Sequence, residues 1–166
     1  MKSLRTRINF RNPVVARCYD KNGNLKWTRR CFNGVTDVGI EQLLDAQFNG
    51  GSQSSTWYML LVDNSGFSAF ADGDTMGSHS GWTEDQTYAA STRPEWTADA
   101  AGSRAVTNSS TVDFAINGTT VIKGIAAVDN NVKGGTSGTL FATASFSSNA
   151  SVENGDTLKV TYTVSG

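Results

Sequence analysis

The sequence lacks several features that mark large classes of proteins. No run approaches the roughly 18 apolar residues that a membrane helix needs, so we expect no membrane contact. Residues 1–13 carry charges but no apolar stretch, so we expect no signal peptide. The two cysteines, Cys18 and Cys31, are too few for a disulfide scaffold or a zinc site. We expect reduced thiols in a chain made in a cytoplasm, although the spacing permits pairing.

What the chain does contain is small and polar. Ser, Thr, Asn and Gly make up 67 of the 166 residues, a composition that favours strands and turns over helices. Only 34 residues are Leu, Ile, Val or Phe, which is close to the ~20% level below which disorder sets in. A net charge of −1, together with four Trp, four Tyr and eight Phe, favours folding instead. The composition predicts a thin-cored all-β domain that gains stability from self-association.

Charge is distributed unevenly along the chain. Residues 1–31 contain nine Lys or Arg and one acid, whereas the remainder contains five basic and fourteen acidic residues. We therefore divide the chain into a basic N-terminal arm and hairpin, 1–33, and a β-sandwich body, 34–166. A basic segment needs an acidic counterpart, and we considered a protein surface, a nucleic acid and a merely solvated strand face.

We favour docking onto protein, either a shell or a neighbouring copy, and expect no nucleic acid, because few aromatic side chains there could stack on bases. The candidate docking residues are Arg5, Arg7, Arg11, Arg17, Lys26, Arg29 and Arg30.

Residues 14–32 are expected to form a hairpin, because Asn22-Gly23 between two strand-like runs is typical of a two-residue turn. We expect one face of the hairpin to be charged, with Arg17, Lys26 and Arg29. We expect the other face to be covered, with Val15, Leu25 and Trp27.

One short helix is predicted over about residues 36–48. Thr36 suits the N-cap, and Asp37 suits the first turn. An apolar face recurs at helical spacing, and Asn49-Gly50-Gly51 ends the helix. The residues of that face are Ile40, Leu43, Leu44 and Phe48.

The rest of the body is expected to form strands. Residues 56–62 are a continuous apolar run, whereas residues 157–164 alternate strictly, as in a sheet with one wet face. Residues 66–105 form a long irregular stretch. Further strands are predicted at 111–116, 119–128 and 139–146, with Gly and Asn turns between them. This pattern predicts a β-sandwich or jelly roll.

The motifs do not support catalysis or metal binding. His79 would need Asp74 or Glu84 to complete a Ser–His–acid site, and no G-x-S-x-G motif accompanies it. Residues 72–84 match a calcium loop at three positions and fail at two ligand positions. Adjacent Glu84 and Asp85 would point to opposite faces of a strand, unlike a glycosidase pair. We expect a non-enzymatic protein without catalytic residues, metal or cofactor.

Aromatic side chains surround an arginine in the irregular stretch. The tryptophan rings could stack on sugars or bases, or the group could hold the loop in place by burial and cation–π contact. We favour the structural role, because aromatic rings are a main source of apolar burial in a thin core. The predicted loop-pinning residues are Trp82, Tyr88, Arg93 and Trp96.

The same stretch carries a distinctive block of sequence. It begins Asp74-Thr75-Met76, continues with Gly81-Trp82-Thr83-Glu84 and Tyr88, and ends Arg93-Pro94-Glu95-Trp96. This D-T-M, G-W-x-E, R-P-x-W pattern resembles a family of virion proteins from tailed bacteriophages, over roughly residues 34–166. The resemblance implies a β-sandwich or jelly-roll module, often trimeric on the capsid exterior, without catalytic residues.

Together these observations predict a capsid decoration, or cement, protein. It would assemble in the host cytoplasm and bind the major capsid protein at capsomer junctions on the head exterior, through its basic N-terminal segment. It would stabilise the shell by mass action and associate with itself, as a trimer. The alternative is a tail- or fibre-associated protein that contacts the host surface through Trp82 or Trp96.

Overall fold

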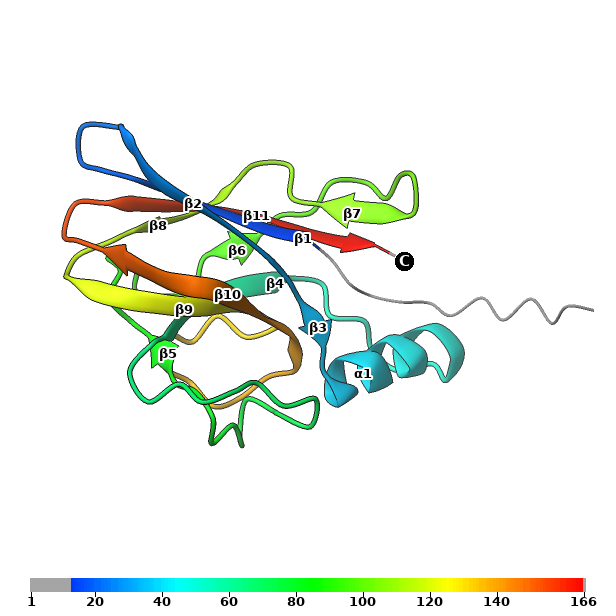
Figure 1. Cartoon of the computed structure of the whole chain (residues 1–166). Coiled ribbons are helices and arrows are strands. Elements are labelled where there is room, and N and C mark those ends of the chain that lie inside the picture. Colours follow the sequence, from blue (N-terminus) through cyan, green and yellow to red (C-terminus); the bar gives the residue numbers. More distant parts are fainter. Residues whose placement is uncertain (1–12, 166) are drawn as a thin grey trace, which may run out of the picture.

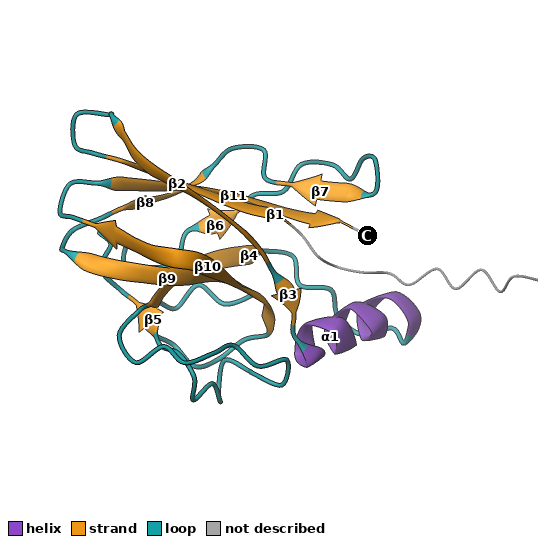
Figure 2. Ribbon diagram, in the orientation of Figure 1, coloured by secondary structure: helices purple, strands orange, loops and turns teal. Residues whose placement is uncertain are grey.

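The computed structural model describes residues 13–165, which form a β-sandwich with a single helix (Figures 1 and 2). The predicted all-β class with one short helix is confirmed. The elements are β1 (Pro13–Tyr19), β2 (Leu25–Phe32), β3 (Gly34–Val35), α1 (Asp37–Phe48), β4 (Trp57–Asp63), β5 (Glu84–Asp85), β6 (Glu95–Trp96), β7 (Ala105–Thr107), β8 (Val112–Ala115), β9 (Thr120–Val128), β10 (Leu140–Val152) and β11 (Thr157–Ser165).

The strands form two antiparallel sheets. Sheet A has the order β2-β1-β11-β7, and β8 also pairs with β11. Sheet B has the order β3-β10-β9-β4-β5, and β6 also pairs with β4. The predicted alternation of β11 is present: Leu158, Val160 and Tyr162 are buried, whereas Lys159 and Thr161 are only partly covered.

The main core lies between the sheets, and a second cluster lies on the other side of sheet B. In that cluster Met76 and Trp82, from the loop after β4, cover Leu60 and Val62 of β4. Because β4 is buried on both faces, its apolar run is continuous instead of alternating.

The predicted hairpin is present, but its turn is longer than two residues. The Asp20 carboxylate accepts hydrogen bonds from the backbone N–H of Asn22 (2.9 Å) and Asn24 (2.8 Å). Gly23 has a φ of 84°, as a turn glycine should, and the pairing shifts at a bulge between Cys18 and Tyr19.

This register makes the predicted charged face of the hairpin wrong. Arg29 pairs with Ala16, whose side chain is fully buried, so Arg29 and Arg17 point to opposite sides of sheet A. Leu25, expected to be covered, is 54% exposed. Since β1 also pairs with β11, the described part of the predicted N-terminal segment belongs to the sandwich itself.

Helix α1 begins where it was predicted. The Thr36 hydroxyl accepts the Gly39 N–H at 3.1 Å, which caps the first turn. Gly39 is the buried residue of the helix, and a Cβ there would lie 2.4 Å from the carbonyl oxygen of Phe141. The helix therefore packs against β10 through Gly39, where the absence of a side chain allows the two backbones to approach closely. Its predicted apolar face is turned away from the core, with Leu44 52% and Phe48 80% exposed.

Candidate functional site

The outer side of sheet A carries three cations from three adjacent strands. Arg17 of β1 lies directly opposite Lys159 of β11, and Arg30 of β2 lies opposite Val15 of β1. Directly opposed residues share a face, and the neighbours of Arg17 in β1 are buried in the core. Arg17, Arg30 and Lys159 therefore form one outward surface, which we call the basic face.

The basic face is only partly neutralised within the described chain. Lys159 forms an ion pair with Asp113 of β8. Among residues 13–165, Arg17 and Arg30 have neither an ion pair nor a hydrogen-bonded side-chain partner. Like charges placed opposite each other on neighbouring strands are destabilising, so an anionic partner would relieve the repulsion between Arg17 and Lys159. A surface of this charge attracts acidic groups.

Two of the predicted docking residues have internal roles instead. Arg29 lies over the ring of Trp27, 5.2 Å from its centroid, and donates to the carbonyl of Asn149 at 3.2 Å. Lys26 Nζ lies 2.7 Å from Asp156 Oδ2. Arg5, Arg7 and Arg11 lie outside the described residues.

Of the four predicted docking residues within residues 13–165, the basic face thus contains Arg17 and Arg30. Lys159 was not among the predicted docking residues, although the alternation of residues 157–164 indicates that its side chain lies on the solvent-facing side of the strand.

The Lys26–Asp156 pair predicts acid sensitivity. Burial alone would raise the pKa of Asp156, but the hydrogen bonds from Lys26 and from the Glu153 amide outweigh it, so the pKa lies below its usual value. A carboxyl with a lowered pKa in the folded state stabilises the fold above its unfolded pKa of about 3.9, and this contribution is lost as the pH falls through the folded value.

We therefore expect Asp156→Asn to lower stability near neutral pH and to flatten the loss of stability below about pH 4. Urea unfolding at several pH values checks this. An identical acid dependence in the two proteins would contradict it.

The predicted loop-pinning residues are all buried. Arg93 is 1% exposed, and its guanidinium donates to both carboxylate oxygens of Glu84, at 3.1 and 2.7 Å. It also donates to the carbonyls of Asn130 (2.9 Å) and Gly135 (2.8 Å). One side chain thereby joins the segment around β5 and β6 to the loop between β9 and β10.

The three aromatic residues lie in different places instead of forming one cluster. Trp82 stacks on His79 with ring centroids 3.9 Å apart. Tyr88 packs edge-on against Phe114 at 5.2 Å. Trp96 is 9% exposed and donates its indole N–H to the carbonyl of Tyr162 at 3.1 Å. Both tryptophan rings are buried, so in this structure neither Trp82 nor Trp96 can make the host contact suggested for them.

Within residues 13–165, the side chains considered for catalysis or metal binding have other partners. His79 Nδ1 lies 3.1 Å from the carbonyl oxygen of Trp82. Asp74 accepts the indole N–H of Trp82 at 2.9 Å, and Glu84 is engaged by Arg93. The described chain contains no group of three or more His, Cys, Asp or Glu side chains placed to hold a metal ion. Within residues 13–165, no helix is long and apolar enough to cross a membrane.

The two cysteines are free and buried. Cys31 pairs with Val14 and Cys18 with Trp27, so the thiols lie four positions apart along β1 instead of facing each other. Burial raises the pKa of each thiol to about 12. Because the thiolate is the reactive form and both thiols are buried, we expect both to react with Ellman's reagent far more slowly than an unperturbed cysteine of pKa about 8.5.

Titration of the folded chain at about pH 8 should detect no fast thiol, and titration in guanidinium should detect both. One thiol that reacts rapidly in the folded chain would show that strand β1 or β2 opens locally.

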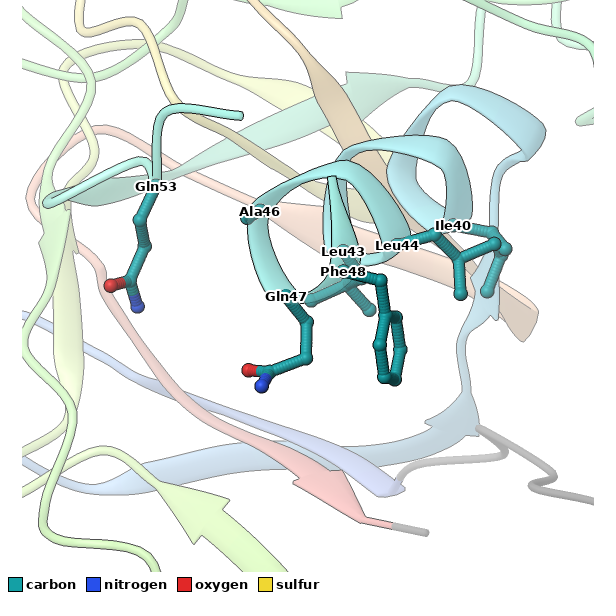
Figure 3. A pocket seen from close by; sticks show the side chains of 7 residues that line it. All are labelled: Ile40, Leu43, Leu44, Ala46, Gln47, Phe48 and Gln53. Carbon is teal, nitrogen blue, oxygen red and sulfur yellow. The ribbon is translucent and has the colours of Figure 1, made fainter. Parts of the chain in front are cut away.

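A groove of about 430 Å³ runs along the exposed apolar side of α1 (Figure 3). It is lined by Ile40, Leu43, Leu44, Ala46, Gln47, Phe48 and Gln53. A second cleft, of about 340 Å³, shares Leu43 and Gln53 with it and reaches Tyr162 and Val164 of β11. The two hollows therefore meet at Leu43 and Gln53.

Comparison of the sequence with known protein families and with curated proteins finds no match. Functional inference for this chain therefore depends on its own residues and their geometry.

Proposed function

We propose that the chain is a non-enzymatic decoration protein on the outside of a tailed-bacteriophage head. In this proposal the basic face binds an acidic surface of the major capsid protein at capsomer junctions. The single observation that supports docking most strongly is the set of outward cations on sheet A, two of which have no partner among residues 13–165. The resemblance of the 74–96 block to phage virion proteins supplies the class of target.

The geometry of the basic face suits a protein partner. Its three cations are held on paired strands, so little conformational freedom of the backbone is lost on binding. A protein that binds duplex DNA electrostatically can make about six to ten phosphate contacts. The three cations of the basic face could make fewer. The outward neighbours of Arg17 on β1 are Val15 and Tyr19, which add apolar area of the kind found within protein interfaces.

A decoration protein of this kind works by differential binding. It binds the assembled shell and not the dissociated subunits, so each bound copy adds free energy to the assembled state. Copies bound around a symmetry axis would also contact each other, which is consistent with the self-association expected for a thin core.

The test compares charge reversal on the basic face with a matched reversal elsewhere. Heads lacking the protein are titrated with the full chain, with Arg17→Glu/Arg30→Glu, and with Lys21→Glu/Arg104→Glu. The control pair is exposed and makes the same change in net charge. We expect about a 100-fold or larger loss of affinity for the first pair only, because opposed like charges cost several kcal/mol and 1.4 kcal/mol is tenfold.

Equal losses for the two pairs would show that total charge, not the basic face, drives binding. Immunogold labelling of intact particles places the protein: label over the whole head supports decoration, whereas label at the tail alone supports the tail or fibre alternative. Tight binding to duplex DNA at about 200 mM salt would overturn the choice of a protein partner.

A further inference from the structure

The apolar side of α1 is only partly covered within residues 13–165. Only Gly39 of this helix is buried, and the groove side holds Leu43, Leu44 and Phe48, which are 38%, 52% and 80% exposed. Figure 3 shows these side chains gathered on one side of the helix, across from Gln53. A helix of 12 residues gains most of its stability from packing, and this one rests on β10 only through the side of Gly39, so cover over its apolar side would stabilise it further.

The same helix is acidic and carries no basic residue. Asp37, Glu41 and Asp45 follow each other at intervals of four, so they lie on one side of the helix. All three are exposed, and within the described chain none forms an ion pair. A natural occupant of the groove would therefore be both apolar and positively charged.

Residues 1–12, which lie outside the described structure, have this composition. Leu4, Thr6, Ile8 and Phe10 alternate with Arg5, Arg7, Asn9 and Arg11, and the segment contains no acid. In an extended conformation such alternation places the apolar side chains on one side and the arginines on the other.

The segment also enters at the right place. Val14 of β1 pairs with Tyr162 of β11, and Tyr162 lines the cleft that shares Leu43 with the α1 groove. Figure 1 shows α1 and the end of β11 at the same end of the sandwich. Twelve residues span at most about 40 Å when extended, whereas a helix of this length measures about 18 Å. The chain can therefore reach the whole groove of its own molecule.

We propose that residues 1–12 occupy the α1 groove of the same molecule, with their apolar side against Leu43, Leu44 and Phe48, where the acids of the helix attract the positive charge of the segment. The effective concentration of a tethered segment is of millimolar order, which favours this site over the groove of another copy. The inference is independent of the proposed docking function, because the basic face lies on sheet A.

Hydrogen exchange of the α1 amides in the full chain tests the proposal. Ile8→Asp/Phe10→Asp should accelerate their exchange about tenfold or more, because an unpaired carboxylate cannot be buried against the apolar side chains of the helix. Ser3→Asp/Asn9→Asp makes the same charge change off the apolar side and should alter exchange far less. The amides of β4 report global folding and should be unaffected by either pair. Unchanged exchange in α1 for the first pair would overturn the proposal.

A charge swap tests the attraction between the arginines and the helix acids. Arg5→Glu/Arg7→Glu and Glu41→Lys/Asp45→Lys should each accelerate α1 exchange, and the combination of all four should restore protection. Additive losses instead would overturn that attraction.

Sedimentation velocity, together with hydrogen exchange over a dilution series, shows whether the bound segment belongs to the same molecule or to a neighbouring copy. Protection that does not depend on concentration in a monomer supports the chain's own segment. Protection that falls on dilution, together with dissociation of an oligomer, would overturn the proposal in favour of a neighbouring copy.

Discussion

Glu84→Gln or Arg93→Met is expected to lower the free energy of unfolding by about 3–5 kcal/mol, because either change leaves a buried charge without its partner. The side chains of Arg93 and Glu84 are 0% and 7% exposed, and their closest oxygen and nitrogen are 2.7 Å apart. Glu84 Oε2 also accepts the backbone N–H of Gly134 at 2.9 Å. The pair therefore ties together three segments that have little regular structure of their own.

A double-mutant cycle separates the pair from its surroundings. Arg93→Met/Glu84→Gln removes both charges, so it should cost clearly less than the sum of the two single changes. Glu95→Gln alters an exposed carboxyl in the same segment and should be within about 0.5 kcal/mol of the parent chain. Urea unfolding gives all four values. Additive losses would show that Arg93 and Glu84 stabilise the loops separately, and the predicted loop-pinning role of Arg93 would then not depend on this ion pair.

Trp82→Ala is expected to cost about 3–5 kcal/mol, because it opens a cavity in a small cluster that cannot collapse around it. Trp82 is 2% exposed, packs against Phe70 and Met76, and covers the outer side of sheet B. Its indole N–H also donates to Asp74, whose carboxylate accepts the Ala71 N–H as well. The loop of residues 64–83 would lose both the buried indole ring and the hydrogen bond from that ring to Asp74.

Two further variants divide the effect of Trp82. Trp82→Phe keeps most of the buried ring and leaves Asp74 without the indole donor, so it should cost about 1–3 kcal/mol. Trp57→Phe is the matched control: Trp57 is half-buried, and its indole N–H has no hydrogen-bond partner within residues 13–165. Exchange of the loop amides should rise for Trp82→Ala and remain unchanged for Trp57→Phe. Equal stability of Trp82→Phe and the parent chain would contradict the role of the Asp74 contact.

Local sequence signals predicted many of the regular elements, because their causes lie within a few residues. The Thr36 hydroxyl meets the amide of Gly39 three positions later, so the helix start was visible in the chain. The alternation of residues 157–164 reflects one covered and one wet side of β11, and it also indicates the outward position of Lys159. Strands β5 and β6 were not predicted, since each has only two residues and exists only by pairing with β4.

The candidate docking surface was predicted only in its overall charge. Nine basic residues near the N-terminus indicated a basic region, but which of them face outward depends on strand register. The longer hairpin turn and the bulge at Cys18 and Tyr19 place Arg29 on the inner side, and one position of slip would reverse this. Lys26 is likewise used by Asp156, which is 130 residues distant in the chain.

The sequence by itself thus determined the fold class, the position of the helix and the excess of positive charge at one end of the chain. These properties follow from composition, periodicity and capping, which act over a few residues. Only the tertiary structure decided that Arg17, Arg30 and Lys159 share one surface and that the apolar side of α1 turns outward. Both depend on contacts between distant segments: the pairing of β1 with β2 and β11, and the close approach of Gly39 to the backbone of Phe141.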